Sequence, residues 1–309
     1  MKINTRIKGK YSLLLLTLIV ILCLCLIVAL CCGHFSIAPG SVIRMLFQRL
    51  FGFFGNNESI DDTVLFDIRL PRILGAIIIG ACLSVSGTAY QSVFQNPLVS
   101  PDILGVSSGA CIGAALAIIL GFPRYLVIIL SFTTGIITVA LTMIIPKIMK
   151  STSNIMLVLS GIIVSGLTTS IMGIIKYIAD PLDELPRITY WTMGSLDGVD
   201  YDQLIIAIVP IVVCSVILIR LSWWIDIIAI GEKDAKTLGV NVKQLRLLII
   251  VCSTFLTAIS VSLCGTIGWI GLVIPHFGRL LIGPSNTKLI PISGLLGAIF
   301  LLVIDTVAR

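Results

Sequence analysis

Long apolar runs separated by short polar segments follow one another along almost the whole chain. Most runs are close to the roughly 20 residues that an α-helix needs to cross about 30 Å of hydrocarbon. We therefore predict an all-α fold, a polytopic bundle of membrane helices in a single domain, residues 1–309. The nine predicted spans are residues 11–32, 73–94, 103–120, 125–146, 155–178, 204–225, 247–265, 267–282 and 289–306. The seventh and eighth spans nearly run together, and Gly265 and Gly268 separate them.

The composition excludes a soluble globular protein. Of the 309 residues, 57% are hydrophobic and only 12% are charged, and the mean hydropathy is +1.12. A soluble domain carries about 25% charged residues, and it has no means of covering this much apolar surface. The chain is therefore expected to reside in lipid.

The distribution of lysine and arginine predicts which side each loop faces. With a cytoplasmic N-terminus, the inner segments carry 13 Lys and Arg against 4 acidic residues, a net charge of +9, and the outer segments carry −3. Basic residues gather on the cytoplasmic side of membrane proteins. The net charge of +6 therefore reflects orientation, and nucleic acid is not expected as a partner.

The cysteines and histidines do not form a pattern that holds a metal. All nine cysteines lie within or at the ends of the predicted spans, no C-x-x-C occurs, and His34 and His276 lie near opposite membrane faces. In lipid, cysteine serves as a small apolar packing residue. We predict no metal site and no cofactor bound by this chain.

Two arginines flank Pro71 at the predicted outer mouth of the second span. Pro71 is predicted to begin that helix, because the first turn of a helix does not need the N–H that proline lacks. From the residues alone, two interpretations stay open. Arg69 and Arg72 are either interfacial anchors whose side chains reach the lipid headgroups, or a pair with a functional role.

The inner loop 95–102 contains Pro97 and Pro101, which predict the end of one helix and the start of the next. Its backbone must face water or protein, because lipid offers it no hydrogen bonds. The loop fits a gate wall, and it fits an ordinary turn equally well.

The longest inner segment, 226–246, contains a short run of helix-forming residues between Gly231 and Gly239. Gly239 suits the position that follows a helix C-terminus. So short a helix has little stability of its own, so packing must hold it, and its surface suits docking into the groove of a partner.

The energy source is predicted to lie outside the chain. Spans 73–94, 103–120, 125–146 and 247–265 contain no Asp, Glu, Lys, Arg or His, whereas ion-coupled transporters place such residues in their spans. The sequence also lacks a G-x-x-x-x-G-K-[ST] nucleotide loop. A separate ATPase docking on residues 226–240 is favoured, and an ion-coupled secondary transporter is the alternative. No nucleophile–base pair points to a membrane enzyme.

Several ordered motifs now identify a resemblance that covers nearly the whole chain. The chain resembles the FecCD-type permeases of type II ABC importers, which carry iron–siderophores, haem or cobalamin. The motifs that carry the resemblance are Arg69-Leu70-Pro71-Arg72, Asn96-Pro97-Leu98, Ala179-Asp180-Pro181, Met193-Gly194-Ser195 and Gly271-Leu272-Val273-Ile274-Pro275-His276.

The resemblance implies an assembly in the cytoplasmic (inner) membrane of a prokaryote. Such permeases have ten helices per subunit and pair as homodimers or fused pairs. They bind two cytoplasmic ATPases, which use ATP and Mg²⁺, and an acidic substrate-binding protein docks on the outer face. A ferric siderophore is the first expectation for the cargo, followed by haem, cobalamin and molybdate.

The resemblance also implies roles for single residues. The arginines expected to receive the binding protein are Arg69, Arg72 and Arg309. The residues expected to form the cytoplasmic gate are Asn96, Leu98, Thr152 and Ser153. The segment expected to couple the permease to the ATPase, about 226–240, includes Gly231, Glu232, Ala235, Leu238 and Gly239.

The chain departs from the family at its end. Relatives continue past the match to Arg309 for one further helix, which lines the pore, whereas this sequence stops there. We expect the sequence to be truncated, because nine spans leave the C-terminus outside.

Overall fold

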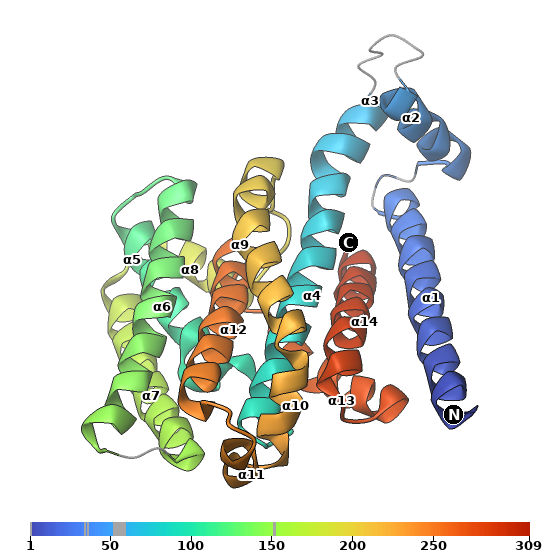
Figure 1. Cartoon of the computed structure of the whole chain (residues 1–309). Coiled ribbons are helices and arrows are strands. Elements are labelled where there is room, and N and C mark those ends of the chain that lie inside the picture. Colours follow the sequence, from blue (N-terminus) through green and yellow to red (C-terminus); the bar gives the residue numbers. More distant parts are fainter. Residues whose placement is uncertain (1, 34, 36, 52–59, 151–152) are drawn as a thin grey trace.

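The computed structural model describes all residues except 1, 34, 36, 52–59 and 151–152. The described residues form helices and connecting turns, without a β-strand (Figure 1). Their helices are α1 (Lys2–Cys31), α2 (Pro39–Phe51), α3 (Ile60–Asp62), η1 (Thr63–Arg69), α4 (Leu70–Val93), η2 (Pro101–Leu104), α5 (Val106–Ile119), α6 (Arg124–Ile148), α7 (Asn154–Ile178), α8 (Glu184–Met193), α9 (Tyr201–Arg220), α10 (Ser222–Ile230), α11 (Glu232–Thr237), α12 (Val242–Cys264), α13 (Ile270–Ile282) and α14 (Asn286–Ala308).

Each of the nine predicted spans corresponds to an apolar helix, but two of these helices are short. Within the described residues, seven helices are long and apolar enough to cross a membrane. The third and eighth spans are α5 and α13, with 14 and 13 residues, which gives each a length of about 20 Å. They are shorter than predicted because residues 101–104 form the 3₁₀ helix η2 and residues 265–269 stay outside any helix.

Pro71 lies in the first turn of α4, which begins at Leu70, as predicted, but the sequence did not predict the helical segment that leads into it. Helical structure already begins at Ile60 and continues through η1, a π-helical segment, into α4. The N–H of Leu70 bonds to the carbonyl of Leu65, five residues back. In a π-helical turn each N–H bonds to the carbonyl five residues back. The chain therefore stays helical from η1 into α4, although Pro71 has no N–H to donate.

The predicted span 204–225 is also divided. α9 ends at Arg220, and after Leu221 the chain begins α10 at Ser222. Apolar residues continue across the break, so hydropathy alone does not locate it. Two further helices, α2 and α8, lie in segments that were predicted to be outer loops.

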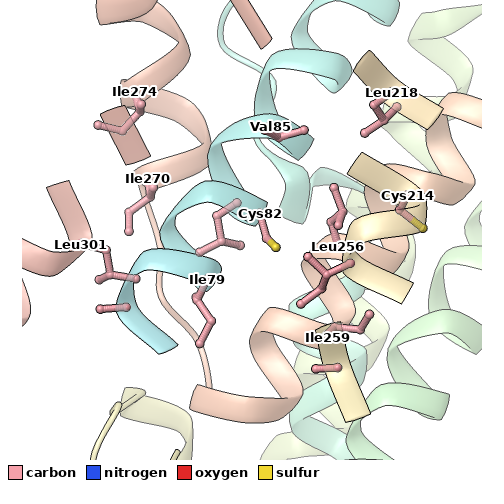
Figure 2. Close-up of a cluster of buried hydrophobic side chains, with 14 of the residues drawn as sticks. Ile79, Cys82, Val85, Cys214, Leu218, Leu256, Ile259, Ile270, Ile274 and Leu301 are labelled. Carbon is pink, nitrogen blue, oxygen red and sulfur yellow. The ribbon is translucent and has the colours of Figure 1, made fainter. Parts of the chain in front are cut away.

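The core is arranged around α4 and α12. In the most apolar 18-residue window of each of these spans, 78% of the residues are buried, compared with 28% in α6, α7 and α9. Figure 2 shows why for α4: Ile79 and Cys82 lie between Leu256 and Ile259 of α12 and the side chains of α13 and α14. The less enclosed helices leave apolar faces for lipid or for a second protein chain.

Small and hydroxyl-bearing residues allow α4 to pack closely on its neighbours, as is typical of membrane helices. Ser86 Oγ donates to the carbonyl of Ser253 at 2.9 Å and lies 2.8 Å from Thr257 Oγ1, both on α12. On the other side of α4, a Cβ added to Gly87 would lie 1.9 Å from the carbonyl oxygen of Gly271. Only glycine fits at this contact between α4 and α13.

The two ends of the bundle carry different features. α11 and the N-terminus of α1 lie at one end, at the bottom of Figure 1, and this is the end that the charge pattern predicts to be cytoplasmic. The C-terminal Arg309 belongs to the other end, together with α2 and the start of α9. We refer to them as the predicted inner and outer ends.

Candidate functional site

The segment between Gly231 and Gly239 forms α11 at the predicted inner end. Gly239 has a left-handed backbone, with φ +79°. Its N–H bonds to the carbonyl of Lys236, and the N–H of Val240 bonds to the carbonyl of Ala235. These two bonds form a Schellman motif, in which glycine follows the helix C-terminus. The predicted position of Gly239 is confirmed.

Side chains on α11 divide between packing and exposure. Ala235 is fully buried, whereas Leu238 is 65% exposed. Glu232 pairs with Lys236 at 3.0 Å and with Arg246 of α12 at 3.1 Å. The hydrogen bond from Lys236 and the contacts with Arg246 lower the pKa of Glu232, and partial burial opposes them. α11 is therefore fixed to α12, with an apolar side chain left facing outward.

The loop between α4 and η2 lies at the same end. Asn96 Oδ1 accepts the N–H of Leu98 at 2.9 Å, and the Leu98 side chain is 77% exposed. At the start of α7, Ser153 Oγ accepts the N–H of Ile155. Asn154 Nδ2 lies 3.5 Å from the carbonyl of Val93, the last residue of α4.

The predicted gate residues Asn96, Leu98 and Ser153 therefore lie on adjacent helix ends. The fourth predicted gate residue, Thr152, lies outside the residues that the structure describes.

The three arginines predicted to receive a binding protein gather at the predicted outer end. Arg72 pairs with Asp197 and, at 2.8 Å, with Asp305 of α14. Arg309 lies 3.4 Å from the same Asp305. Arg69 and Arg309 both donate to backbone carbonyls in the last turn of α1.

These arginines are largely enclosed. Arg69 is 4% exposed, and its guanidinium donates to the carbonyls of Leu30 and Cys31 and to that of Phe35. Carbonyls in the last turn of a helix lack partners within the helix, so Arg69 caps α1. Arg72 is the most accessible of the three, because 18% of its side chain is exposed, compared with 8% for Arg309, and its partner Asp197 lies at the surface.

A cavity of about 420 Å³ adjoins this cluster. Its walls include Arg124 at the start of α6, Arg187, Tyr190 and Trp191 of α8, and Asp197. Asp197 thus links the cavity to Arg72. Among the described residues, no group of three His, Cys, Asp or Glu is placed to hold a metal ion.

Sequence reasoning missed the acidic partners and Gln95. Asp305 and Arg309 are four residues apart on one helix, a spacing that brings side chains together and offered a signal. Asp197 is 125 residues away from Arg72, and no local pattern indicates that contact. Gln95 Nε2 donates to the carbonyl of Ile228 at 2.7 Å, which the sequence also gives no means of predicting.

Comparisons with known proteins place this geometry in context. The model of the FecCD transport family matches residues 19–309. The molybdate import system permease protein MolB of Haemophilus influenzae is 37% identical over 299 residues, which is 97% of this chain and 88% of MolB. A probable iron chelatin transport system permease protein of Helicobacter pylori is 38% identical over 258 residues, 83% of this chain and 78% of that protein.

A solved structure is also similar throughout. It is described as an inward-facing conformation of a metal-chelate type ABC transporter, and it superposes with a TM-score of 0.85 at 37% sequence identity. The match covers 96% of this chain and 90% of the other.

Proposed function

Because this chain belongs to the FecCD transport family and is the permease of an ABC importer for a metal chelate or a related compound, we propose that its cargo is a ferric siderophore. The observation that carries the importer role is the family match over residues 19–309. The relative named for iron chelatin, 38% identical over 83% of this chain, supports the ferric chelate. The family match favours an ABC permease over the ion-coupled transporter that composition left open.

We propose that α11 and its flanking residues receive a separate ATPase. The chain has no nucleotide loop of the G-x-x-x-x-G-K-[ST] type, so ATP and Mg²⁺ are assigned to the partner, and this chain binds no cofactor. Leu238 offers the exposed apolar contact. Ala235 and the ion pairs of Glu232 hold the segment against the body of the permease, so a push on α11 is transmitted to the helices.

We propose that the loop bearing Asn96 and Leu98, together with Ser153 and Thr152, closes the cytoplasmic side of the pathway. The exposure of Leu98 supports this role, because an apolar side chain at a helix end is suited to meeting its copy across a dimer axis. The assembly is then a homodimer in the cytoplasmic membrane of a prokaryote, with the N-terminus inside. The exposed apolar side chains of α7 leave a face for the second copy or for lipid.

The outer arginine cluster is proposed as the docking site of a substrate-binding protein. Arg72 is the residue through which an acidic partner makes contact, since Arg69 is engaged with α1. Arg309 and Asp305 position Arg72 from beneath. A docking carboxylate competes with Asp197 for the Arg72 guanidinium.

Molybdate is the second candidate cargo. The observation in its favour is the similarity to MolB, which extends over 97% of this chain. Arg124 and Arg187 in the wall of the outer cavity are compatible with molybdate and with an anionic ferric chelate, so the cavity does not separate the two.

Competitive uptake separates the two cargoes. The permease is reconstituted with its cognate ATPase and binding protein, and uptake of a radiolabelled ferric siderophore is measured with increasing molybdate. Uptake of radiolabelled molybdate is then measured with increasing siderophore. The proposal expects ATP-dependent siderophore uptake that excess molybdate leaves unchanged. Molybdate uptake that a siderophore does not inhibit would assign the chain to the second candidate.

A further inference from the structure

We propose that Gln95 and Asp226 are positioning residues that transmit movement of the coupling segment to the cytoplasmic gate. The inference rests on the proposed function of that segment and of the loop bearing Asn96 and Leu98. It adds a specific route between them. Two sets of hydrogen bonds join α10, which leads into α11, to the ends of α4 and α14.

The first connection is made by Gln95, the residue that precedes Asn96. Its Nε2 donates to the carbonyl of Ile228 at 2.7 Å. Ile228 lies in the last turn of α10, whose final carbonyls have no partner within the helix. The loop that carries the gate therefore caps α10 with a side chain, and a shift of α10 acts directly on Gln95.

The second connection runs through Asp226, two residues earlier on α10. Its Oδ1 accepts the backbone N–H of Asn286 at 2.5 Å and the Asn286 side-chain amide at 2.8 Å, and its Oδ2 accepts Ser285 Oγ at 3.0 Å. Asn286 is the first residue of α14, so an aspartate of α10 caps α14. Asn286 Oδ1 in turn accepts a hydrogen bond from Ser92 Oγ at 2.7 Å. Ser92 lies in the last turn of α4, directly before the loop that bears Asn96 and Leu98, so this network also reaches the proposed gate.

The backbone of Gln95 supports a role beyond packing. Its φ is +52°, a left-handed conformation that is uncommon for residues other than glycine and asparagine. Such strain persists where the surroundings require it. A glycine would adopt this conformation without cost, yet it would lack the amide that reaches Ile228. Position 95 therefore has a residue that tolerates this conformation less well than glycine but supplies the Nε2 donor.

The direct test replaces Gln95 by glycine. Gln95→Gly removes the donor and relieves the backbone, so the variant is expected to fold at least as well as the wild type. Lys150 has the same φ of +52° and is exposed at another turn of the predicted inner end, which makes Lys150→Gly the matched control. Gln95→Lys restores a donor of similar reach and is expected to recover function.

Two readouts are taken on the permease reconstituted with its ATPase and binding protein. The first is cargo taken up per ATP hydrolysed. The second is labelling of a cysteine at Leu98, with and without nucleotide, in a background without the nine native cysteines. For Gln95→Gly we expect uptake per ATP to fall about two- to tenfold, the range set by one hydrogen bond, and the nucleotide dependence of labelling to shrink.

Asp226 is tested by a pair of variants. Asp226→Asn keeps an oxygen that accepts from Asn286 and is expected to retain most of the coupling, whereas Asp226→Leu loses it. A stable Gln95→Gly permease with wild-type uptake per ATP and an unchanged labelling response would overturn the inference, as would an equal loss in Lys150→Gly. If the wild-type complex itself shows no ATP-driven uptake, the proposed function fails, and this outcome is distinct from failure of the transmission route.

Discussion

Gly239 ends α11 with a backbone φ of +79°, and a Cβ added to it would meet no other atom within 4 Å. The space around the residue is open, so the glycine is required by the backbone conformation alone. A left-handed conformation costs other residues roughly 1–2 kcal/mol. The coupling segment thus owes its shape to one residue that makes no side-chain contact.

Replacing Gly239 by proline is predicted to uncouple transport. Proline cannot adopt this φ, and it removes the N–H that bonds to the carbonyl of Lys236 at 3.0 Å. Because proline cannot reach this conformation, its penalty exceeds the roughly 1–2 kcal/mol of other residues, so uptake per ATP is expected to fall by more than about fivefold. Gly121→Pro is the control, since Gly121 has φ +67°, open space and an N–H bond of 3.0 Å to Ile118, but lies at the outer end. Equal losses in both variants would contradict the prediction.

Glu232 gives the coupling segment a dependence on pH. Its pairs with Lys236 and Arg246 place its folded-state pKa below the ordinary value of 4.5. Stabilisation from a lowered carboxylate pKa is present above the unfolded-state value and is lost as the pH falls through the folded-state value. The pairs are partly exposed and contribute only about 0–1 kcal/mol each.

A spin label at position 238 would report this effect. The label on Leu238→Cys is expected to be ordered at neutral pH and to become more mobile as the pH falls below 4.5. In a Glu232→Gln background it should be more mobile at neutral pH and nearly independent of pH. Asp183→Asn, which breaks the outer pair with Arg187, should leave the titration unchanged. An identical titration with and without Glu232 would refute the assignment.

Single residues differ in how well the sequence predicted them. Gly239 was placed correctly, because the position after a helix end has a backbone requirement that the residue type reveals. Arg69 and Arg72 lie at the end of the bundle opposite α11, as expected from the sequence, but Arg69 is only 4% exposed. Its burial depends on the last turn of α1 folding back over it, 38 or 39 residues away. Contacts of that kind are fixed by packing, and a local pattern does not contain them.

At the scale of helices, α4 holds the molecule together through close contacts on both sides. Gly87 abuts the backbone of Gly271 in α13, and Ser86 bonds to α12. Hydropathy predicted the existence of these helices, since the run of apolar residues sets a length. It did not predict the break after Arg220 or the π-helical entry at Thr63–Arg69, because both depend on hydrogen bonding and leave the apolar pattern unbroken.

The Gly87 contact predicts a large asymmetry between two glycine-to-alanine changes. Gly87→Ala places a methyl group 1.9 Å from a backbone oxygen, so the helices must separate, and overpacking typically costs about 1–3 kcal/mol. Gly166 in α7 has no atom within 4 Å of an added Cβ, so Gly166→Ala should be neutral or stabilising by up to about 1 kcal/mol. Unfolding in a detergent titration measures both. Equal stability of the two variants would show that α4 and α13 do not approach as described.

For the whole molecule, the two ends carry the two proposed partner sites. In this proposal α11 provides the ATPase contact at the predicted inner end, and Arg72, which pairs with Asp197 and Asp305, provides the contact at the predicted outer end. Composition and charge predicted a multi-pass membrane protein and which loops lie together. The contacts between loop residues far apart in the sequence were visible only in the fold. The hydrogen bond between Gln95 and Ile228 is an example.

Docking of the binding protein is predicted to depend on Arg72 and to be opposed by Asp197. Arg72→Ala should weaken docking by up to about fivefold, since a partly exposed charge contributes about 0–1 kcal/mol. Asp197→Asn frees Arg72 and should strengthen docking. Both effects should fade as salt rises, because the Debye length is about 8 Å at 0.15 M. Arg187→Ala, on the same face, serves as the control, and Arg69 is avoided because its loss would release α1.

Surface plasmon resonance of the cognate binding protein on permease in nanodiscs gives these affinities across a salt series. An Asp197→Asn variant that binds more weakly than the wild type would show that the aspartate itself contacts the partner. Affinities independent of both residues would leave the outer arginines with a role in holding the helices alone.

ATP-driven uptake by the assembled complex in proteoliposomes tests the central claim most directly. The permease is combined with its ATPase and binding protein, and cargo accumulation is followed with ATP, without ATP, and with an ATPase variant that binds but does not hydrolyse the nucleotide. We predict accumulation only when ATP is hydrolysed and the cargo-loaded binding protein is on the side of the membrane opposite to the ATPase. Accumulation by the permease alone, driven by a proton or sodium gradient, would contradict the account.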